Sequence, residues 1–323
     1  WPQANMFNQP QLEAGLLERF LSLQPNGLRR GMEVVSVEER DGLCTVQVRD
    51  CDSRTSTETS QFVVGCDGAN STVRNLLGLE FEDQGFFFDW LVVDVRLHEQ
   101  RNFEPSMLQV CDPARPTTLM PGGDPSWRRW EFMALPHEDV DSLATDEAAW
   151  RLLAPWDINA STATLIRRAT YRFRARWAKT WRVGSIFLAG DAAHQTPPFA
   201  GQGMCAGLRD AVNLAFKLDL AMQGFDVLDS YEQERLPHVM AVIHFAMELG
   251  KVICVADPQE AAARDAMLVP LLKEGVSTES PDLPPLTGGL LGEGLSAGAL
   301  MPQEIVTVAG RSGRLDTLVD FEW

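Results

Sequence analysis

Apolar residues recur at intervals of three and four in three stretches of the chain. In the first stretch they occupy positions 12, 16, 17, 20 and 23, which is the spacing of one face of a helix. The helices predicted from this spacing cover residues 10–24, 203–223 and 228–252. Beyond residue 257 the chain is rich in Pro and Gly and poorly periodic, which predicts irregular structure with a surface linker at 280–300.

Runs of β-branched and aromatic residues predict strands between these helices. Two runs, 33–38 and 43–48, flank Asp41-Gly42, a pattern typical of a β-hairpin. The polar stretch 52–60 is predicted to be a connection. The other predicted strands cover residues 61–65, 86–96, 106–111, 128–135, 164–177 and 185–190. With one helix near 139–154, the region between 83 and 177 is predicted to form a mixed sheet.

The composition is that of a globular protein and limits the classes of partner. Among 323 residues, 45% are apolar and 23% are charged, and the net charge is −17. An acidic chain of this kind is not expected to bind nucleic acid or an anionic membrane. Apolar runs fall short of the ~20 residues that a membrane helix needs, and a signal-peptide pattern is absent from the sequence. We expect a cytoplasmic protein.

The cysteines give no sign of a metal site. None of the six forms a CxxC pair, and no group of His and Cys has metal-ligand spacing. Reduced thiols are the expectation for such a chain inside a cell.

One basic stretch runs against the acidic trend. Its residues are Arg167, Arg168, Arg172, Arg174, Arg176, Lys179 and Arg182. They could form an anion site, but from 171 to 177 basic and apolar residues alternate, as on a half-buried strand with a solvated outer face. The solvated face is the favoured interpretation.

The densest candidate site begins at Gly190-Asp191. A buried strand, 185–190, ends there in a tight turn, and doubly wound sheets bind ligands outside the carboxyl ends of their strands. An Asp at this place can accept a hydrogen bond from a sugar-like hydroxyl. The helix that begins at Gly203 presents unpaired N–H groups, which suit a ligand that gains negative charge. An ordinary strand–helix loop would show the same pattern.

Two motifs carry a more specific signal together. The first runs Gly190-Asp191-Ala192-Ala193-His194, continues through Pro197-Pro198 and Gly201-Gln202-Gly203-Met204, and ends in the segment 207–218. The second is the segment 63–74, which contains Cys66-Asp67-Gly68-Ala69-Asn70-Ser71 and ends at Arg74. They resemble the "GD" and "DG" motifs of the class A flavoprotein aromatic monooxygenases, which have the para-hydroxybenzoate hydroxylase fold. The sequence of residues 207–218 looks most like that of the 3-(3-hydroxyphenyl)propionate hydroxylases.

The resemblance implies roles for individual residues. Asp191 should accept from the ribityl chain of FAD, and Pro198 should lie on the side of the flavin where oxygen reacts. His194 is expected to be a structural hydrogen-bonder. The cofactor-binding residues that the resemblance implies are Gln9, Asp67, Arg74, Gly190, Asp191, Gly203, Met204 and Cys205. Gln9 could instead be a helix-start residue without a ligand, Asp67 part of a plain turn, and Arg74 a surface or helix-capping residue.

The implied reaction is hydroxylation of a phenolic ring through a flavin C4a-hydroperoxide. The resemblance implies FAD as the cofactor and NADH or NADPH as the co-substrate. It implies O2 and a 3-hydroxyphenylpropionate-type compound as the substrates. A polycyclic or polyketide phenol is the alternative substrate, and a non-catalytic fragment the alternative function. The catalytic base is unassigned, since His98 and His137 are guesses. A homo-oligomer is compatible with the sequence.

The resemblance also implies an incomplete α/β fold. The family opens with a strand, a GxGxxG turn and a helix that hold the pyrophosphate, and GxGxxG does not occur between Trp1 and Trp323. We therefore expect a chain truncated at both ends, which would bind FAD weakly. Residues 1–82 and 178–255 should form a partial, Rossmann-like FAD-binding domain, with 83–177 inserted as a substrate-binding mixed β-sheet domain. Residues 256–323 should form a linker toward an absent C-terminal domain.

Overall fold

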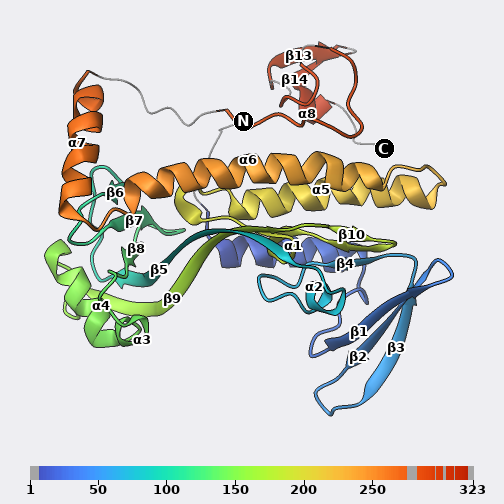
Figure 1. The fold of residues 1–323 in the computed structure, drawn as a ribbon, viewed down its shortest axis with the longest axis horizontal. Coiled ribbons are helices and arrows are strands. Elements are labelled where there is room, and N and C mark those ends of the chain that lie inside the picture. The colour runs from blue at the N-terminus through green and yellow to red at the C-terminus, as the bar shows by residue number, and fades with distance from the viewer. Residues whose placement is uncertain (1–6, 275–281, 295, 301–302, 309, 319–323) are drawn as a thin grey trace.

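The computed structural model of the protein describes residues 7–274, 282–294, 296–300, 303–308 and 310–318. A long, bent antiparallel sheet runs through the molecule, and two long helices lie side by side across it (Figure 1). In spatial order its strands are β12 (His194–Gln195), β9 (Ala163–Ala178), β5 (Phe81–Leu97), β8 (Trp127–Met133), β7 (Thr117–Pro121) and β6 (Leu108–Val110).

The amino-terminal part contains a helix and a projecting three-stranded sheet (Figure 1). Helix α1 (Gln9–Leu23) and the hairpin of β1 (Glu33–Arg40) and β2 (Leu43–Arg49) confirm the predicted elements. The expectation that 52–60 is a connection was wrong, because β3 (Thr55–Ser60) pairs with β2. This edge strand is polar on both faces and largely exposed, so hydrophobic alternation does not reveal it.

A second small sheet joins segments that are far apart in the sequence. Strand β4 (Val63–Gly65) lies parallel to β11 (Ile186–Leu188), which pairs on its other side with β10 (Arg182–Val183). Strand β11 is fully buried, and its apolar side chains enter the larger core together with Val73, Trp181 and Tyr231. The Tyr231 hydroxyl donates to the Leu188 carbonyl over 2.9 Å and ties a long helix to this strand.

Two faces of the six-stranded sheet bury different side chains. One face carries Leu91, Val93, Trp130 and Phe132, which pack against the short helices below. These helices, α3 (Val140–Leu143) and α4 (Asp146–Leu153), are separated at Thr145, whose side chain caps α4, where a single helix had been predicted. The opposite face carries Trp90 and Met133, which pack against Ile253 and Cys254.

The carboxyl-terminal helices form the layer above the sheet. Helices α5 (Gly203–Met222) and α6 (Asp229–Ile253) agree with the predicted boundaries. By length and composition α6 could cross a membrane, with a mean hydropathy of 1.3 in one window. One such helix is weak evidence, and its buried Glu234 and Arg235 form ion pairs with α5. These contacts identify α6 as a core helix.

The expectation of irregular structure beyond residue 257 was wrong for α7 (Pro258–Lys273). Asp257 caps this helix and Pro258 begins it, but only Ala261 is buried, so its apolar residues form no distinct stripe. The described residues between 282 and 300 contain no helix or strand, as predicted. Strands β13 (Ile305–Val308) and β14 (Arg311–Arg314) and helix α8 (Leu315–Leu318) follow.

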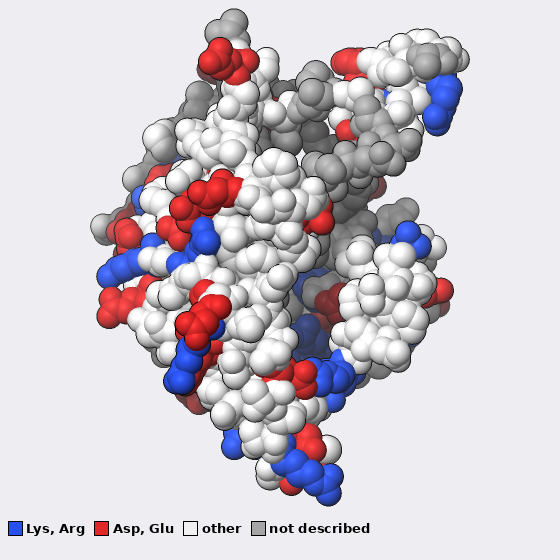
Figure 2. Space-filling view, turned by 90° about the vertical axis from the view of Figure 1, so that its right-hand side faces the viewer, with Lys and Arg blue, Asp and Glu red and all other residues white. Residues whose placement is uncertain are grey.

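The basic stretch has a solvated outer face, as predicted. Most of its side chains pair with acidic residues at the surface, for example Arg172 with Asp89 at 2.8 Å. The other ion pairs are Arg168–Asp146, Arg174–Asp83, Lys179–Glu80 and Arg182–Asp229. On the face of the molecule in Figure 2, acidic and basic side chains are interspersed. Neither observation points to an anion site.

Candidate functional site

The parallel pairing of β4 with β11 brings the two sequence motifs together. Leu188 lies opposite Gly65, and the Ala189 N–H donates to the Gly65 carbonyl over 3.1 Å. Asp67 and Asp191 follow directly after the two strands. Both turns therefore lie at the same edge of this small sheet, which is the edge where sheets of this kind hold ligands.

Gly190 makes the turn after β11 possible. Its φ of +60° lies in the left-handed region, and its Cα is 3.3 Å from the place a Cβ on Gly207 would take. The turn and helix α5 are thus in backbone contact. A larger residue at position 207 would push the turn away from the helix.

A buried carboxylate on α5 anchors this turn from below. Asp210 Oδ2 accepts from the Gly190 N–H at 3.0 Å and contacts His194 Nε2 at 2.6 Å, while Oδ1 accepts from Arg235 Nε at 2.8 Å. Burial by itself raises the pKa of Asp210, but the hydrogen bond and charge of His194, with Arg235, bring it below the ordinary value. His194 is fully buried, in agreement with the structural role expected for it.

The beginning of α5 is open to a ligand. Gln202 precedes the helix without a side-chain cap, so the N–H groups of Gly203, Met204 and Cys205 find no acceptor within the helix. Met204 is 40% exposed. A Cβ on Gly201 would meet nothing within 4 Å, and Thr196 Oγ1 in the preceding loop is buried without a partner among the described residues. A flat ligand with acceptors along one edge fits these features.

The motif around Asp67 is held by its own side chains. Asp67 Oδ2 accepts from the Val73 N–H at 3.0 Å. Arg74 is buried rather than on the surface, and it donates to the carbonyls of Ala192 at 2.9 Å and Ala69 at 3.2 Å. Arg74 therefore joins the two motifs through their backbones, and Phe81 stacks against its guanidinium, 4.0 Å from the ring centre.

Asp191 and Pro198 lie on the outer side of this turn. The Asp191 side chain is exposed, although desolvation by the surrounding turn raises the pKa of its carboxyl group. Pro198 begins a short 3-10 turn, 198–200, that ends at Gly201. Phe199 in this turn packs against Trp90 of the large sheet, with ring centres 5.9 Å apart. The 198–200 turn thus connects the region of the two motifs with the six-stranded sheet.

Gln9 lies at the start of α1, where it donates to Glu13 over 2.8 Å. The neighbouring Asn8 caps α1 and packs against Gly123 in the β7–β8 turn, since a Cβ there would lie 2.2 Å from the Asn8 Cβ. Gln9 is therefore a helix-start residue beside the large sheet. Among the described residues, the side-chain hydrogen bond of Gln9 goes to Glu13 and not to either motif.

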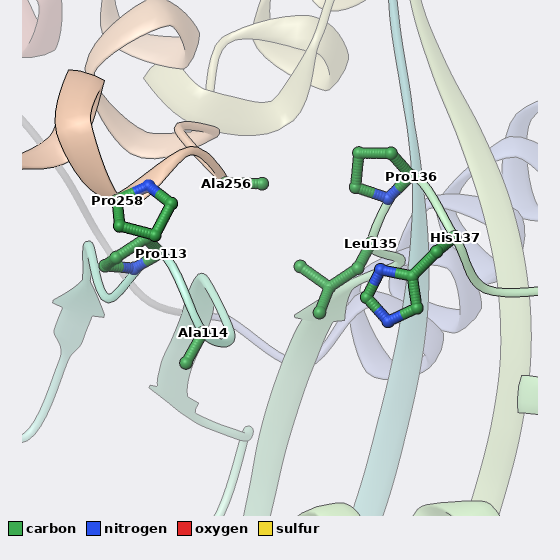
Figure 3. Close-up of a pocket in the computed structure, with 7 residues that line it drawn as sticks. All are labelled: Pro113, Ala114, Leu135, Pro136, His137, Ala256 and Pro258. Carbon is green, nitrogen blue, oxygen red and sulfur yellow. The ribbon is translucent and has the colours of Figure 1, made fainter.

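Two adjoining cavities open between the large sheet and the end of α6. One has a volume of about 230 Å³ and is lined by Phe88, Met133 and Cys254, among others. The second, of about 300 Å³, is lined by Pro113, Ala114, Leu135, Pro136, His137, Ala256 and Pro258 (Figure 3). The first lies against the aromatic cluster of Phe88, Trp90, Phe173 and Phe199.

Of the two histidines considered as bases, His137 lines the larger of these two cavities. Both ring nitrogens of His98 are engaged, Nδ1 with the Ser161 carbonyl and Nε2 with Thr164 Oγ1, each at 3.0 Å. This surface arrangement makes His98 a structural residue.

The roles of Asp210 and Arg235 were not predicted from the sequence. Asp210 belongs to the buried stripe of α5, which consists of Ala206, Asp210, Leu214 and Lys217. These positions are three or four apart, so an acidic residue and a lysine fall where the pattern requires apolar ones. That mismatch was the available signal of a buried polar network.

Comparison with known proteins gives a consistent picture. Residues 1–246 match the family model described as "FAD binding domain". The chain is 37% identical over its whole length to "Probable NADH-specific resorcinol 4-hydroxylase" of Rhodococcus jostii (strain RHA1), covering 61% of that protein. It is 34% identical over 99% of its length to "3-(3-hydroxy-phenyl)propionate/3-hydroxycinnamic acid hydroxylase" of Burkholderia cenocepacia (strain HI2424), covering 60% of it. The chain thus spans about 60% of the length of these curated relatives.

Solved structures show the same fold. OxyS anhydrotetracycline hydroxylase from Streptomyces rimosus matches with a TM-score of 0.72 and 26% identity, over 94% of this chain and 62% of that one. The p-nitrophenol 4-monooxygenase PnpA from Pseudomonas putida DLL-E4 matches with a TM-score of 0.70 and 22% identity, over 82% and 68%. The mixed α/β architecture is therefore one that aromatic monooxygenases share.

Proposed function

Because this chain belongs to the FAD-binding domain family, we propose that it takes part in FAD-dependent hydroxylation of a phenolic ring, with NADH or NADPH as reductant. The observation that carries the proposal is the pairing of β4 with β11. It gathers the Asp67 turn, the Asp191 turn and the uncapped start of α5 at one edge. The flavin, when bound and reduced, would activate O2 for transfer of one oxygen atom to the ring.

Each part of this edge has a task suited to its chemistry. Asp191 would accept a hydrogen bond from a hydroxyl of the ribityl chain. The N–H groups of Gly203, Met204 and Cys205 would hold the pyrimidine edge of the flavin, where negative charge gathers. Pro198 would border the face where oxygen reacts. Arg74 and Asp67 would act indirectly, since they hold the backbone of both motifs.

We propose a single-ring phenol as the substrate. Both curated relatives are named for compounds with one phenolic ring, and identity to them is higher than to OxyS. Cavities of about 230 and 300 Å³ suit one ring with a short side chain, since about 150 Å³ is enough for benzene. The name of the first relative favours NADH. A polycyclic phenol is the second candidate, which the likeness to OxyS favours.

The division of the chain follows from the same arrangement. We propose that 1–82 and 178–255 hold the flavin and that 83–177 form the substrate sheet, inserted between the two motifs. We propose that the protein is cytoplasmic, because its reaction would consume NADH. This arrangement is compatible with a homo-oligomer.

The test is turnover by the complete protein loaded with FAD. Resorcinol or 3-(3-hydroxyphenyl)propionate should accelerate NADH oxidation, and mass spectrometry should find product heavier by one oxygen atom. Oxygen labelled as ¹⁸O2 should enter the product. A flavin-loaded protein that oxidises NADH at the same rate with every phenol, and yields no hydroxylated product, would overturn the proposal.

A further inference from the structure

Glu131 is a buried carboxylate without a hydrogen-bond partner among the described residues. It lies on β8 and is 8% exposed. Its neighbours across the sheet are Val92 on β5 and Thr118 on β7. A carboxylate so placed is costly to keep unpaired, because burial removes the water that would otherwise solvate it.

The polar groups near Glu131 are engaged elsewhere. Arg129, two residues away on the same face of β8, donates to both oxygens of Asp94, at 2.7 and 3.0 Å. The Thr118 hydroxyl donates to Gln109 over 2.7 Å. Arg129 therefore acts on Glu131 through its charge, while its hydrogen bonds to a carboxylate go to Asp94.

An unpaired donor lies on the same face of the sheet. Trp90 Nε1 is buried and has no acceptor among the described residues. Trp90 pairs with Met133 and Val92 pairs with Glu131, so Trp90 and Glu131 are diagonal neighbours across β5 and β8. Such neighbours have Cα atoms about 7–8 Å apart, within reach of long side chains. An acceptor and a donor thus stand unpaired beside each other.

This face borders the space proposed for the substrate. Met133, which pairs with Trp90 and lies two residues after Glu131 on β8, lines the cavity of about 230 Å³. The Trp90 ring contacts Phe199, the residue after Pro198, with ring centres 5.9 Å apart. Phe173 completes an apolar wall, and its ring centre is 6.2 Å from that of Trp90. A ring held here would be close to the turn that begins at Pro198.

We propose that Glu131 and Trp90 together bind the hydroxyl group of the phenolic substrate. The proposal deepens the proposed function and rests on it. The Glu131 carboxylate accepts the phenolic proton, which leaves a phenolate and a neutral carboxylic acid. Trp90 Nε1–H donates to the phenolate oxygen. No other reactant is needed for this proton transfer, and phenolate is the more nucleophilic form of the ring.

The electrostatic surroundings suit Glu131 to accept a proton. Burial raises its pKa to about 7, Arg129 opposes this rise and Asp94 adds to it. A base with this pKa takes the proton of a phenol, whose pKa is about 10, about 300-fold more favourably than a carboxylate with the ordinary value of 4.5. It also remains partly ionised at neutral pH. Arg129 and Asp94 are the charged groups on this face that affect its titration.

The experiment compares three variants of the FAD-loaded complete protein with resorcinol as substrate. Glu131→Gln keeps the shape but removes the base, so kcat/KM should fall 100-fold or more and the limb of its pH profile near pH 7 should vanish. Trp90→Phe removes the donor alone and should raise the Kd of resorcinol about 10-fold. Glu82→Gln changes an exposed glutamate on β5 and should leave both quantities unchanged.

The outcomes separate this proposal from the broader one. Bound flavin, measured by absorbance, and the thermal unfolding midpoint of each variant show whether it is folded and loaded. If the wild-type protein hydroxylates resorcinol while Glu131→Gln retains its kcat/KM and pH profile, the role of Glu131 is overturned and the proposed function stands. If the wild-type protein produces no hydroxylated phenol, both fail together.

Discussion

The backbone N–H of Gly190 donates to Oδ2 of Asp210 over 3.0 Å, so a buried carboxylate on α5 holds the turn that carries Asp191. Arg235 and His194 contact the same carboxylate from α6 and β12. The geometry of the proposed flavin edge therefore depends on residues that touch no ligand. Disturbing this network should alter stability first and flavin binding second.

Asp210→Asn should destabilise the protein by about 3–5 kcal/mol, because it leaves Arg235 buried without its counter-charge. Chemical denaturation followed by circular dichroism would measure the free energy of unfolding. Asp219→Asn, at an exposed position of the same helix, should change it by less than about 0.5 kcal/mol. Equal effects of the two substitutions would contradict the anchoring role of Asp210.

Stability should fall as the pH drops from about 6.5 to 4, because of His238. Burial, reinforced by Arg235 and Arg209, lowers the pKa of His238 from 6.5 to about 4. The unfolded chain therefore binds more protons in this window, so the contribution of His238 is complete above pH 6.5 and is lost as the pH falls through 4. The loss should be on the order of 2–3 kcal/mol.

His238→Gln should remove this part of the pH dependence. Unfolding free energies of the wild-type protein and the variant at several pH values between 4 and 7 would measure it. His98→Gln, which changes an exposed histidine, should leave the slope unchanged. If the free energy of unfolding of His238→Gln depends on pH as steeply as that of the wild-type protein, another group causes the effect.

Arg74→Gln should cost about 1–3 kcal/mol of stability, because the carbonyls of Ala192 and Ala69 lose their donor. Thermal unfolding would detect the loss. Arg19→Gln on the exposed face of α1 serves as a control and should be neutral. A neutral Arg74→Gln would show that the two motifs hold together without this bridge.

Asp191→Ala should weaken FAD binding without a comparable effect on folding, because the side chain is exposed. An unpaired ribityl hydroxyl would cost about 1–3 kcal/mol, which corresponds to a Kd about 5- to 150-fold higher. Titration of the apoprotein with FAD, followed by flavin fluorescence, would measure it. Asp226→Ala, in the exposed turn between α5 and α6, is the matched control and should leave the Kd of FAD unchanged. An unchanged Kd for Asp191→Ala as well would argue against the ribityl contact.

The sequence by itself determined the elements with strong local periodicity. Helices α1, α5 and α6, the β1–β2 hairpin and the short buried strand β11 were all predicted, because side-chain spacing and turn residues act over a few positions. Strand β3 and helix α7 were missed for the same reason. Strand β3 contains only polar residues and forms because β2 offers it an edge, and the apolar residues of α7 form no distinct face.

Only the tertiary structure decided which of these elements meet and what burial does to their charged groups. The pairing of β4 with β11 joins residues more than a hundred positions apart, and no local pattern specifies such a partner. Arg74, predicted to bind the cofactor or to lie at the surface, is a buried bridge between the backbones of the two motifs, and Glu131 is a buried carboxylate on a central strand of the large sheet. Desolvation and charge act through space, so the pKa of His238 or Glu131 depends on packing that the neighbouring residues in the chain do not reveal.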